Sequence, residues 1–279
     1  MAMVINTNIA SINSQRRLSE TNNNLSTSME RLSSGLRVNS AKDDAAGLAI
    51  SNRMTSQIRG MTVATRNASD GISLAQTAES AMGELTNTLQ RMRDLGVQSA
   101  NDGAVTGSDR DKLQSEFKQL NDELSRIVTS TEFNGKKIIN GSLASGLAIQ
   151  VGANTASDNR ILVSIENLAS TLAAVTSASV GSAATASGAR NAIDAIDAAI
   201  KSIDTSRAKL GAIQNRFTTT ISNLQSSIEN QSAARSRITD TDFATETANL
   251  SRSQILQQAG TAMLAQANQS GQSVLSLLR

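Results

Sequence analysis

The chain has 279 residues, a formal net charge of +2, an aromatic content of 1%, and no His, Cys, Pro, Trp or Tyr. Without His or Cys it lacks the usual zinc ligands, a thiol nucleophile and a side chain that titrates near neutral pH, which excludes most enzyme classes. Its mixed charges form no basic face for nucleic acid, no apolar run is long enough to span a membrane, and the amino-terminal residues do not resemble a secretory signal.

Apolar residues of the amino-terminal segment recur at intervals of three, four or seven, which predicts a coiled-coil-like helix. They are Leu18, Leu25, Met29, Leu32 and Leu36, and Ile5, Ile9 and Ile12 extend the pattern toward the terminus. Gly35 and Asn39 carry turn chemistry, so the helix is expected to end there.

The stretch SAKDDAAGLAI, residues 40–50, places two adjacent carboxylates beside a lysine. A catalytic acid pair, a metal site and a helix start are the three interpretations. Ser40 and Asp43 fit the S-x-x-D capping arrangement, and acids suit the positive end of a helix dipole. We therefore favour Ser40, Lys42, Asp43 and Asp44 as helix-start residues, with Lys42 or Asp43 available for ion pairing with another subunit.

A second series of mostly apolar residues, spaced three or four positions apart, runs from Met54 to Met92 and predicts a helix of about fifty residues or more. After the glycine-containing segment 101–109, a third helix is expected, with Leu113, Phe117, Leu120, Leu124 and Ile127 on its seam. Residues 131–169 differ, because two Asn-Gly pairs and two short alternating runs, 147–151 and 161–165, predict a β-hairpin. The small, polar stretch 170–190 is expected to be a loop or weakly ordered tip.

Helical spacing returns from Ile193 to Ile228. The polar segment 236–242 interrupts it, and Asp240 to Asp242 can cap a last helix with Glu246 as a first-turn acid. The final stripe is Leu256, Ala259, Met263, Ala267, Ser270, Val274 and Leu277. We therefore predict a mainly α fold: an elongated antiparallel helical bundle or coiled coil, with a small β-hairpin element at the far end.

Each terminal segment has few large apolar side chains, so packing against one partner does not offset the backbone entropy lost on ordering it. We therefore expect the termini to be disordered in the free monomer and to fold by packing against several other subunits. The residues predicted for this terminal assembly face are Ile5, Ile9, Ile12, Leu25, Leu32, Leu256, Met263, Val274, Leu277 and Leu278.

Six ordered segments resemble those of bacterial flagellins. They are MAMVINTNIASINSQRRL (1–18), ERLSSGLRVNSAKDDAAGLAISNRM (30–54), LQRMRDLGVQSAN (89–101), EFNGKKIING (132–141), LGAIQNRF (210–217) and SRSQILQQAGTAMLAQANQSGQSVLSLLR (251–279). The resemblance implies an extracellular filament subunit for motility, not an enzyme and without a cofactor, exported by the flagellar secretion apparatus with no cleavable signal peptide. It implies a minimal form lacking large outer domains.

The resemblance also implies a domain order. Residues 1–40 and 241–279 are the two halves of a terminal coiled-coil domain that forms the inner tube, and 41–169 and 191–240 are the rod parts. Residues 170–190 stand in place of the outer domains. The implied partners are other copies of the chain, the filament cap protein, an export chaperone and hook–filament junction proteins, with no nucleic acid or membrane among them.

In some relatives, positions matching Gln90, Arg91, Leu95, Gln98 and Glu116 contact an innate immune Toll-like receptor. The alternative, which we prefer, is a packed helical face that is also used between subunits.

Three other interpretations of the whole chain are an enzyme, a chemoreceptor-type signalling coiled coil and a hook–filament junction protein. The chain supplies no pocket residues for an enzyme and no anchor for a chemoreceptor. The continuous terminal and rod segments favour a filament subunit over these.

Overall fold

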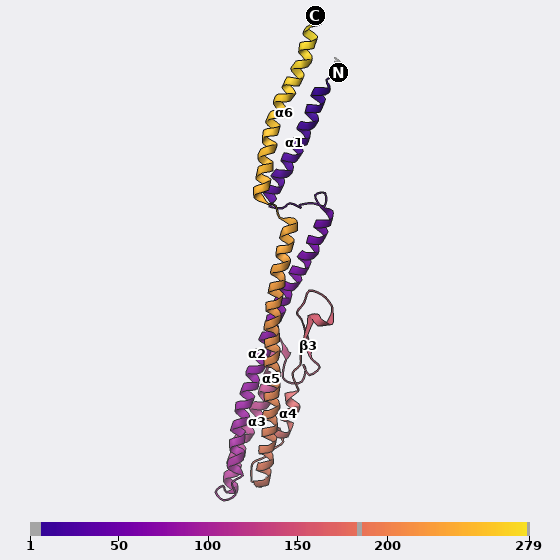
Figure 1. Ribbon diagram of the computed structural model, residues 1–279. Helices are drawn as coiled ribbons and strands as arrows, with labels where there is room; N and C mark the ends of the chain where they lie inside the picture. Colours follow the sequence, from indigo (N-terminus) through magenta and orange to yellow (C-terminus); the bar gives the residue numbers. More distant parts are fainter. Residues whose placement is uncertain (1–6, 183–185, 278–279) are drawn as a thin grey trace. The chain divides into compact units, whose positions relative to one another are not determined.

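The computed structural model of the protein describes residues 7–182 and 186–277, with side chains up to residue 269. Among the described residues the fold is mainly α, as predicted, with six α-helices and two small antiparallel β-hairpins (Figure 1). Two compact units divide the chain. The terminal unit joins the two ends of the chain, up to Gln57 and from Glu229, and the central unit is Ile58–Ile228.

The terminal unit contains α1 (Ile9–Ser34), α6 (Phe243–Leu277), the first turns of α2 (Ala45–Ser99) and the last turns of α5 (Ala186–Thr239). The Asn8 side chain caps α1 by accepting a hydrogen bond from the Ser11 N–H. At the other end Gly35 adopts φ +72° and donates its N–H to the Arg31 carbonyl, a left-handed cap that glycine makes without steric cost. The predicted break at Gly35 is confirmed.

The two connections of the terminal unit are hydrogen-bonded to each other. Leu36 and Asp240 form an isolated antiparallel bridge, the Arg37 N–H donates to the Thr239 carbonyl at 2.6 Å, and the Thr241 N–H donates to the Gly35 carbonyl. Asp242 then caps α6 by accepting from the Ala244 and Thr245 N–H groups, within the predicted capping segment. The domain boundaries expected at residues 40 and 241 fall inside this unit and stay a prediction.

The start of α2 differs from the expected one. The helix begins at Ala45, and its cap is Asp44, which accepts from the Gly47 N–H at 2.8 Å. The Ser40 and Asp43 pair closes a separate turn before the helix, because the Asp43 carboxylate accepts from the Ser40 N–H and hydroxyl. Both aspartates satisfy backbone N–H groups, and only the second lies at a helix terminus.

Asp44→Ala should therefore lower the free energy of unfolding by about 1 kcal/mol, the usual cost of losing an N-cap. Ser40→Ala should cost less, because it removes a hydroxyl from an exposed turn and leaves the helix cap intact. Urea denaturation of the full chain, followed by far-ultraviolet circular dichroism, measures both. An equal loss for the two variants would instead place the start of the helix at Ser40.

The core of the central unit lies between α2 and α5, which run antiparallel. Arg93 of α2 pairs with Asp197 of α5 at 2.7 Å, and the Gln214 amide donates to Glu79 at 2.9 Å. Side chains at helical spacing fill the space between them: Met82, Leu85, Leu89 and Met92 from α2, and Ile196, Ile203, Leu210 and Phe217 from α5, all fully buried or nearly so. The helix α3 (Gly107–Ser130) adds buried Phe117, Leu124 and Val128 to the same core.

Two hairpins lie in the central unit where one was predicted. The predicted hairpin is confirmed as β3 (Leu147–Gln150) paired with β4 (Arg160–Val163), and a 3-10 turn (Ser157–Asn159) lies in their connection. A shorter hairpin joins β1 (Glu132–Phe133) to β2 (Lys136–Lys137). Its turn is Asn134-Gly135, both with positive φ, as the Asn-Gly signal indicates.

The expectation of a loop over 170–190 is wrong for much of that stretch. The helix α4 spans Leu168–Thr176, Val180 is fully buried, and α5 begins at Ala186. The loop was predicted from the small and polar composition of the stretch. Its few apolar residues nevertheless fall at helical spacing and bury one face of α4. The Gln114 side-chain oxygen of α3 accepts from the N–H groups of Val180 and Gly181, which fixes the connection after α4.

Candidate assembly surface

The helices α1 and α6 lie side by side and antiparallel in the terminal unit (Figure 1). The Asn8 amide donates to the Ala267 carbonyl at 2.8 Å near one end of the pair, and the Ser28 hydroxyl donates to Glu246 at 2.5 Å near the other. We call the positions of α1 and α6 that face each other the seam. Its most buried residues are polar and mostly small: Ser11, Ser28, Glu246 and Ser253.

Large apolar side chains lie on the outside of this helix pair. Among the residues predicted for the terminal assembly face, Ile9 is 62% exposed, Ile12 55%, Leu256 51% and Met263 63%. A helix of a folded domain ordinarily turns its apolar stripe toward the core. Here the pairing of the two helices leaves more than half of each of these side chains in solvent, and together they make up the exposed apolar surface of the pair.

Leu25 and Leu32 do not belong to this exposed surface, because both are half-buried on the side of α1 that carries Ser28. Ile5 and Leu278 lie outside the described residues. The backbone of Val274 and Leu277 is helical, and their side chains lie outside the described part of the chain. The predicted face omitted three residues that are more than half exposed: Met29, Phe243 and Ile255. The consecutive pair Ile255-Leu256 was the signal that two sides of α6 are apolar.

A polar cluster inside the seam was not predicted. The Glu246 carboxylate is buried, with the Ser28 hydroxyl on one oxygen and the Arg31 Nη1 at 3.9 Å from the other. The Arg31 Nε is also buried and has no hydrogen-bond partner among the described residues. Glu246 was expected as a first-turn acid of the last helix, with no partner on α1. The available signal was Ser28, a polar residue between Leu25 and Leu32 in the apolar stripe.

The helix-start residues are mostly accessible. Ser40, Lys42 and Asp43 are exposed, and Asp44 is half-buried at its cap. Hydrogen bonds from the backbone N–H and hydroxyl of Ser40 hold the pKa of Asp43 below its usual value, so its charge persists in moderate acid. These residues form no converging acid pair, because Asp43 is directed back to Ser40 and Asn39 while Asp44 caps α2.

Only some residues of the predicted receptor face lie on the surface of the protein. Gln90, Arg91, Gln98 and Glu116 are exposed, and Arg91 of α2 bridges to Glu116 of α3 at 2.6 Å. Leu95 is 1% exposed and belongs to the core of the central unit, so its inclusion in that face is wrong. Leu95 lies three residues beyond Met92, where the predicted stripe ended, and one further step of the same spacing would have included it.

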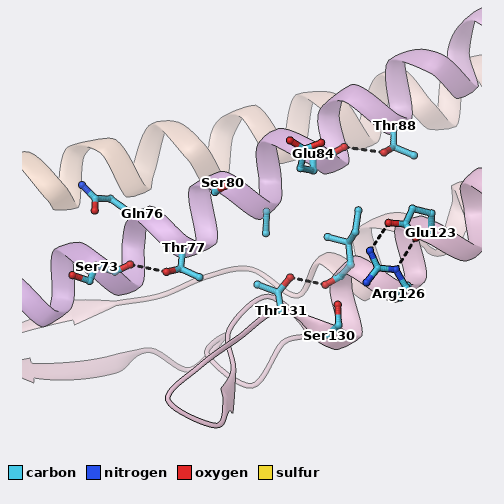
Figure 2. Close-up of a pocket in the computed structure, with 12 residues that line it drawn as sticks. Ser73, Gln76, Thr77, Ser80, Glu84, Thr88, Glu123, Arg126, Ser130 and Thr131 are labelled. Atoms are coloured by element: carbon cyan, nitrogen blue, oxygen red, sulfur yellow. Dashed lines mark hydrogen bonds and ion pairs between the residues drawn. The ribbon is translucent and has the colours of Figure 1, made fainter.

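A polar groove of about 860 Å³ lies between α2 and α3. Figure 2 shows its lining of hydroxyls and charged side chains. The hydroxyls of Thr77 and Thr88 donate to carbonyls of their own helix, and Glu123 is paired with Arg126 at 2.5 Å. These groups already have partners, and the groove offers no nucleophile held by a base.

Among residues 7–182 and 186–277, no three acidic side chains converge on a point that could hold a metal ion. No helix in the described chain combines the length and apolarity needed to cross a membrane. The apolar outer surface of the α1–α6 pair is therefore the most distinctive candidate site.

Family comparison agrees with this picture. The sequence profile of the bacterial flagellin N-terminal helical region matches residues 5–144, and that of the C-terminal helical region matches residues 193–278. The chain belongs to the bacterial flagellin family. This flagellin is 46% identical to a flagellin of Halalkalibacterium halodurans over 99% of this chain and 100% of that protein. It is 41% identical to Flagellin A of Vibrio cholerae over the full length of both.

The alignment with the Vibrio protein extends over 386 positions, more than the 279 residues of this chain, so this flagellin is a small form. The solved structure of a putative flagellar hook-associated protein from Vibrio parahaemolyticus has a similar fold, with a TM-score of 0.60 at 13% identity. That similarity covers 71% of this chain and 100% of the other.

This flagellin is a structural subunit of the bacterial flagellar filament, which serves motility. Its homologues form that filament outside the cell. The resemblance seen in the six ordered segments is thereby confirmed.

Proposed function

We propose that this flagellin polymerises through its terminal helices, which complete their folding only against neighbouring copies and so form the inner tube of the filament. The observation that carries this proposal is the exposed apolar surface of the α1–α6 pair. Ile9, Ile12, Leu256 and Met263 are each more than half exposed in the single chain. Burial of such a side chain contributes about 1.5–3 kcal/mol, and that gain is available only between subunits.

The polar seam supports the same proposal. A pair of helices joined mainly through serines, a glutamate and half-buried leucines buries little apolar area, and isolated helices are marginal in water. The termini therefore need further partners to become stably helical. In the filament, copies on several sides supply them.

We further propose that the chain has no enzymatic role and that its remaining partners are those of filament export and growth. They are the flagellar secretion apparatus, an export chaperone, the filament cap protein and hook–filament junction proteins. The chaperone has a physical motive, because Leu256 and Met263 are apolar and exposed before assembly. We propose export without a cleaved signal peptide, which an intact-mass measurement of the secreted protein tests.

Seeded polymerisation tests the proposed assembly. The full chain should extend seeds into long filaments that pellet and are visible by negative-stain microscopy. Chains lacking residues 1–40 or 241–279 should stay in the supernatant, because each lacks one helix of the pair. Circular dichroism of the truncated chains, which retain the central unit, should still report a folded helical protein. Truncated chains that polymerise as well as the full one would refute the proposed role of the termini.

The same experiment distinguishes the junction-protein alternative. A hook–filament junction protein shares the terminal helices but adds only a limited number of subunits. Its full chain would cap or bridge seeds without lengthening them. Filament length that increases with the concentration of free subunit supports a filament subunit instead.

The exposed part of the receptor face is proposed to pack between subunits. This predicts that Arg91→Ala leaves the response in a Toll-like receptor reporter assay equal to that of the unmodified protein. Arg126→Ala is the matched control, because Arg126 also pairs with an exposed glutamate at the surface of the central unit. A response about tenfold weaker for Arg91→Ala alone, equivalent to about 1.4 kcal/mol of binding, would assign the face to the receptor.

A further inference from the structure

The apolar pattern of the seam does not by itself define how α1 and α6 are aligned. On α1 the half-buried leucines, Leu18, Leu25 and Leu32, recur every seven residues. On α6 the facing positions also repeat every seven, as Leu250, Gln257 and Leu264 and as Glu246, Ser253, Gly260 and Ala267. A slip of seven residues would again place leucines opposite small residues or leucines. Seven residues correspond to about 10 Å along a helix, so such a slip changes which outward-facing residues of α1 and α6 lie next to each other.

Glu246 breaks this repeat. It is the charged residue in a series whose other members are small and neutral, and it is 7% exposed. The observed alignment places its two carboxylate oxygens against the Ser28 hydroxyl, at 2.5 Å, and the Arg31 guanidinium, at 3.9 Å. Burial of a carboxylate is costly unless hydrogen bonds and an opposite charge compensate it.

Each slipped alignment takes some or all of this compensation away from Glu246. A slip in one direction brings Glu246 opposite Thr21, which is seven residues from Ser28 and ten residues, or nearly three turns, from Arg31. A slip in the other direction brings it opposite Gly35, which has no side chain. The first slip leaves the buried carboxylate without both Ser28 and Arg31. The second keeps Arg31 within one turn but removes the Ser28 hydroxyl, and it also breaks the backbone hydrogen bonds that join Gly35 and Arg37 to Thr241 and Thr239.

We propose that Glu246, held by Ser28 and Arg31, fixes the register of α1 against α6. A single buried polar group fixes the register of many coiled coils in this way, at some cost in stability. The register in turn decides which apolar side chains of α1 and α6 share one outer surface. This inference rests on the proposed function, because the shared surface matters only if the terminal helices pack between copies.

Cross-linking between introduced cysteines measures the register, and the chain has no cysteine of its own. Asn22→Cys with Gln257→Cys reports the native alignment, because the Gln257 amide donates to Asn22 at 2.9 Å. Gln15→Cys or Met29→Cys, each with Gln257→Cys, reports the two slipped alignments. A short bifunctional reagent is applied to assembled filaments, and intramolecular products are identified by mass spectrometry.

The unmodified seam should give the native product and little slipped product. Glu246→Leu should raise the ratio of slipped to native product at least tenfold, whereas Glu20→Gln, at an exposed acid of α1, should leave it unchanged. The exchange Ser28→Glu with Glu246→Ser restores the same two groups on opposite helices beside Arg31. It should return the ratio to that of the unmodified seam.

The outcomes separate the register from assembly. If the unmodified chain does not polymerise, the proposed function fails. If it polymerises and Glu246→Leu keeps only the native product, the register proposal fails while the function stands. If Glu246→Leu prevents polymerisation, the exchange decides: recovered filaments with the native product support the register role, and no recovery overturns it.

Discussion

Filaments should fail to grow at ordinary subunit concentrations when Leu256 or Met263 is replaced by Glu. Each side chain is more than half exposed in the single chain, so the change should leave the helical content of the monomer nearly unaltered. In the filament each variant loses about 1.5–3 kcal/mol of apolar burial and places a charge in an apolar contact. The critical concentration for growth should therefore rise at least about 100-fold. Sedimentation over a range of subunit concentrations measures it.

Gln258→Glu is the matched control for these variants. Gln258 is an exposed residue of the same helix and receives the same new charge, but it is polar to begin with. Its critical concentration should change little. Normal growth of the Leu256→Glu and Met263→Glu variants would show that the exposed apolar surface is not an assembly contact. Equal loss in all three variants would assign the effect to charge and not to apolar packing.

Phe217→Ala should be the most destabilising single change considered for the central unit, with a loss of about 3–5 kcal/mol in the free energy of unfolding. Phe217 is fully buried in a core that has few aromatic residues. Its ring lies directly on the backbone of Gly71, where an added Cβ would be 2.7 Å from the ring. Truncation removes the ring from between α2 and α5 and leaves a cavity in the core. Urea denaturation of the full chain measures the loss.

Phe243→Ala provides the comparison, because it is the same substitution at a phenylalanine that is 56% exposed. Its effect on the unfolding of the monomer should be much smaller than that of Phe217→Ala. Comparable losses at both positions would mean that Phe243 is buried in solution. That result would contradict the exposure of the outer surface of α6.

The sequence predicted the long helices well because their apolar residues repeat at helical spacing over many turns. The same spacing identified the core residues of α5, from Ile196 to Phe217. It missed α4 because the stretch was judged by its small and polar composition, whereas only a few apolar residues are needed to bury one face of a short helix. The start of α2 was displaced because Ser40 and Asp44 both carry capping chemistry, and only backbone geometry chooses between them.

The assembly surface could be predicted only in part. Spacing identified Ile9, Ile12, Leu256 and Met263 as apolar positions of amphipathic helices. It could not decide which side of α1 faces α6, because Leu25 and Leu32 follow the same periodicity as the exposed residues. That choice depends on pairing between segments more than 200 residues apart, with a buried Ser28–Glu246 contact that the pattern of apolar residues does not contain. The resemblance placed Leu95 on a surface, whereas it is buried in the core, one step of three residues beyond the end of the predicted α2 stripe.

The antiparallel pairing of α2 and α5 also has a kinetic consequence. The ion pair between Arg93 and Asp197 joins residues 104 positions apart, and the Glu79 and Gln214 contact joins residues 135 positions apart. Contacts of such high sequence separation require closure of a long loop before they contribute stability. A chain that emerges from its amino terminus therefore cannot complete this core until the residues up to Phe217 are present. The central unit can therefore fold completely only after most of the polypeptide has been made.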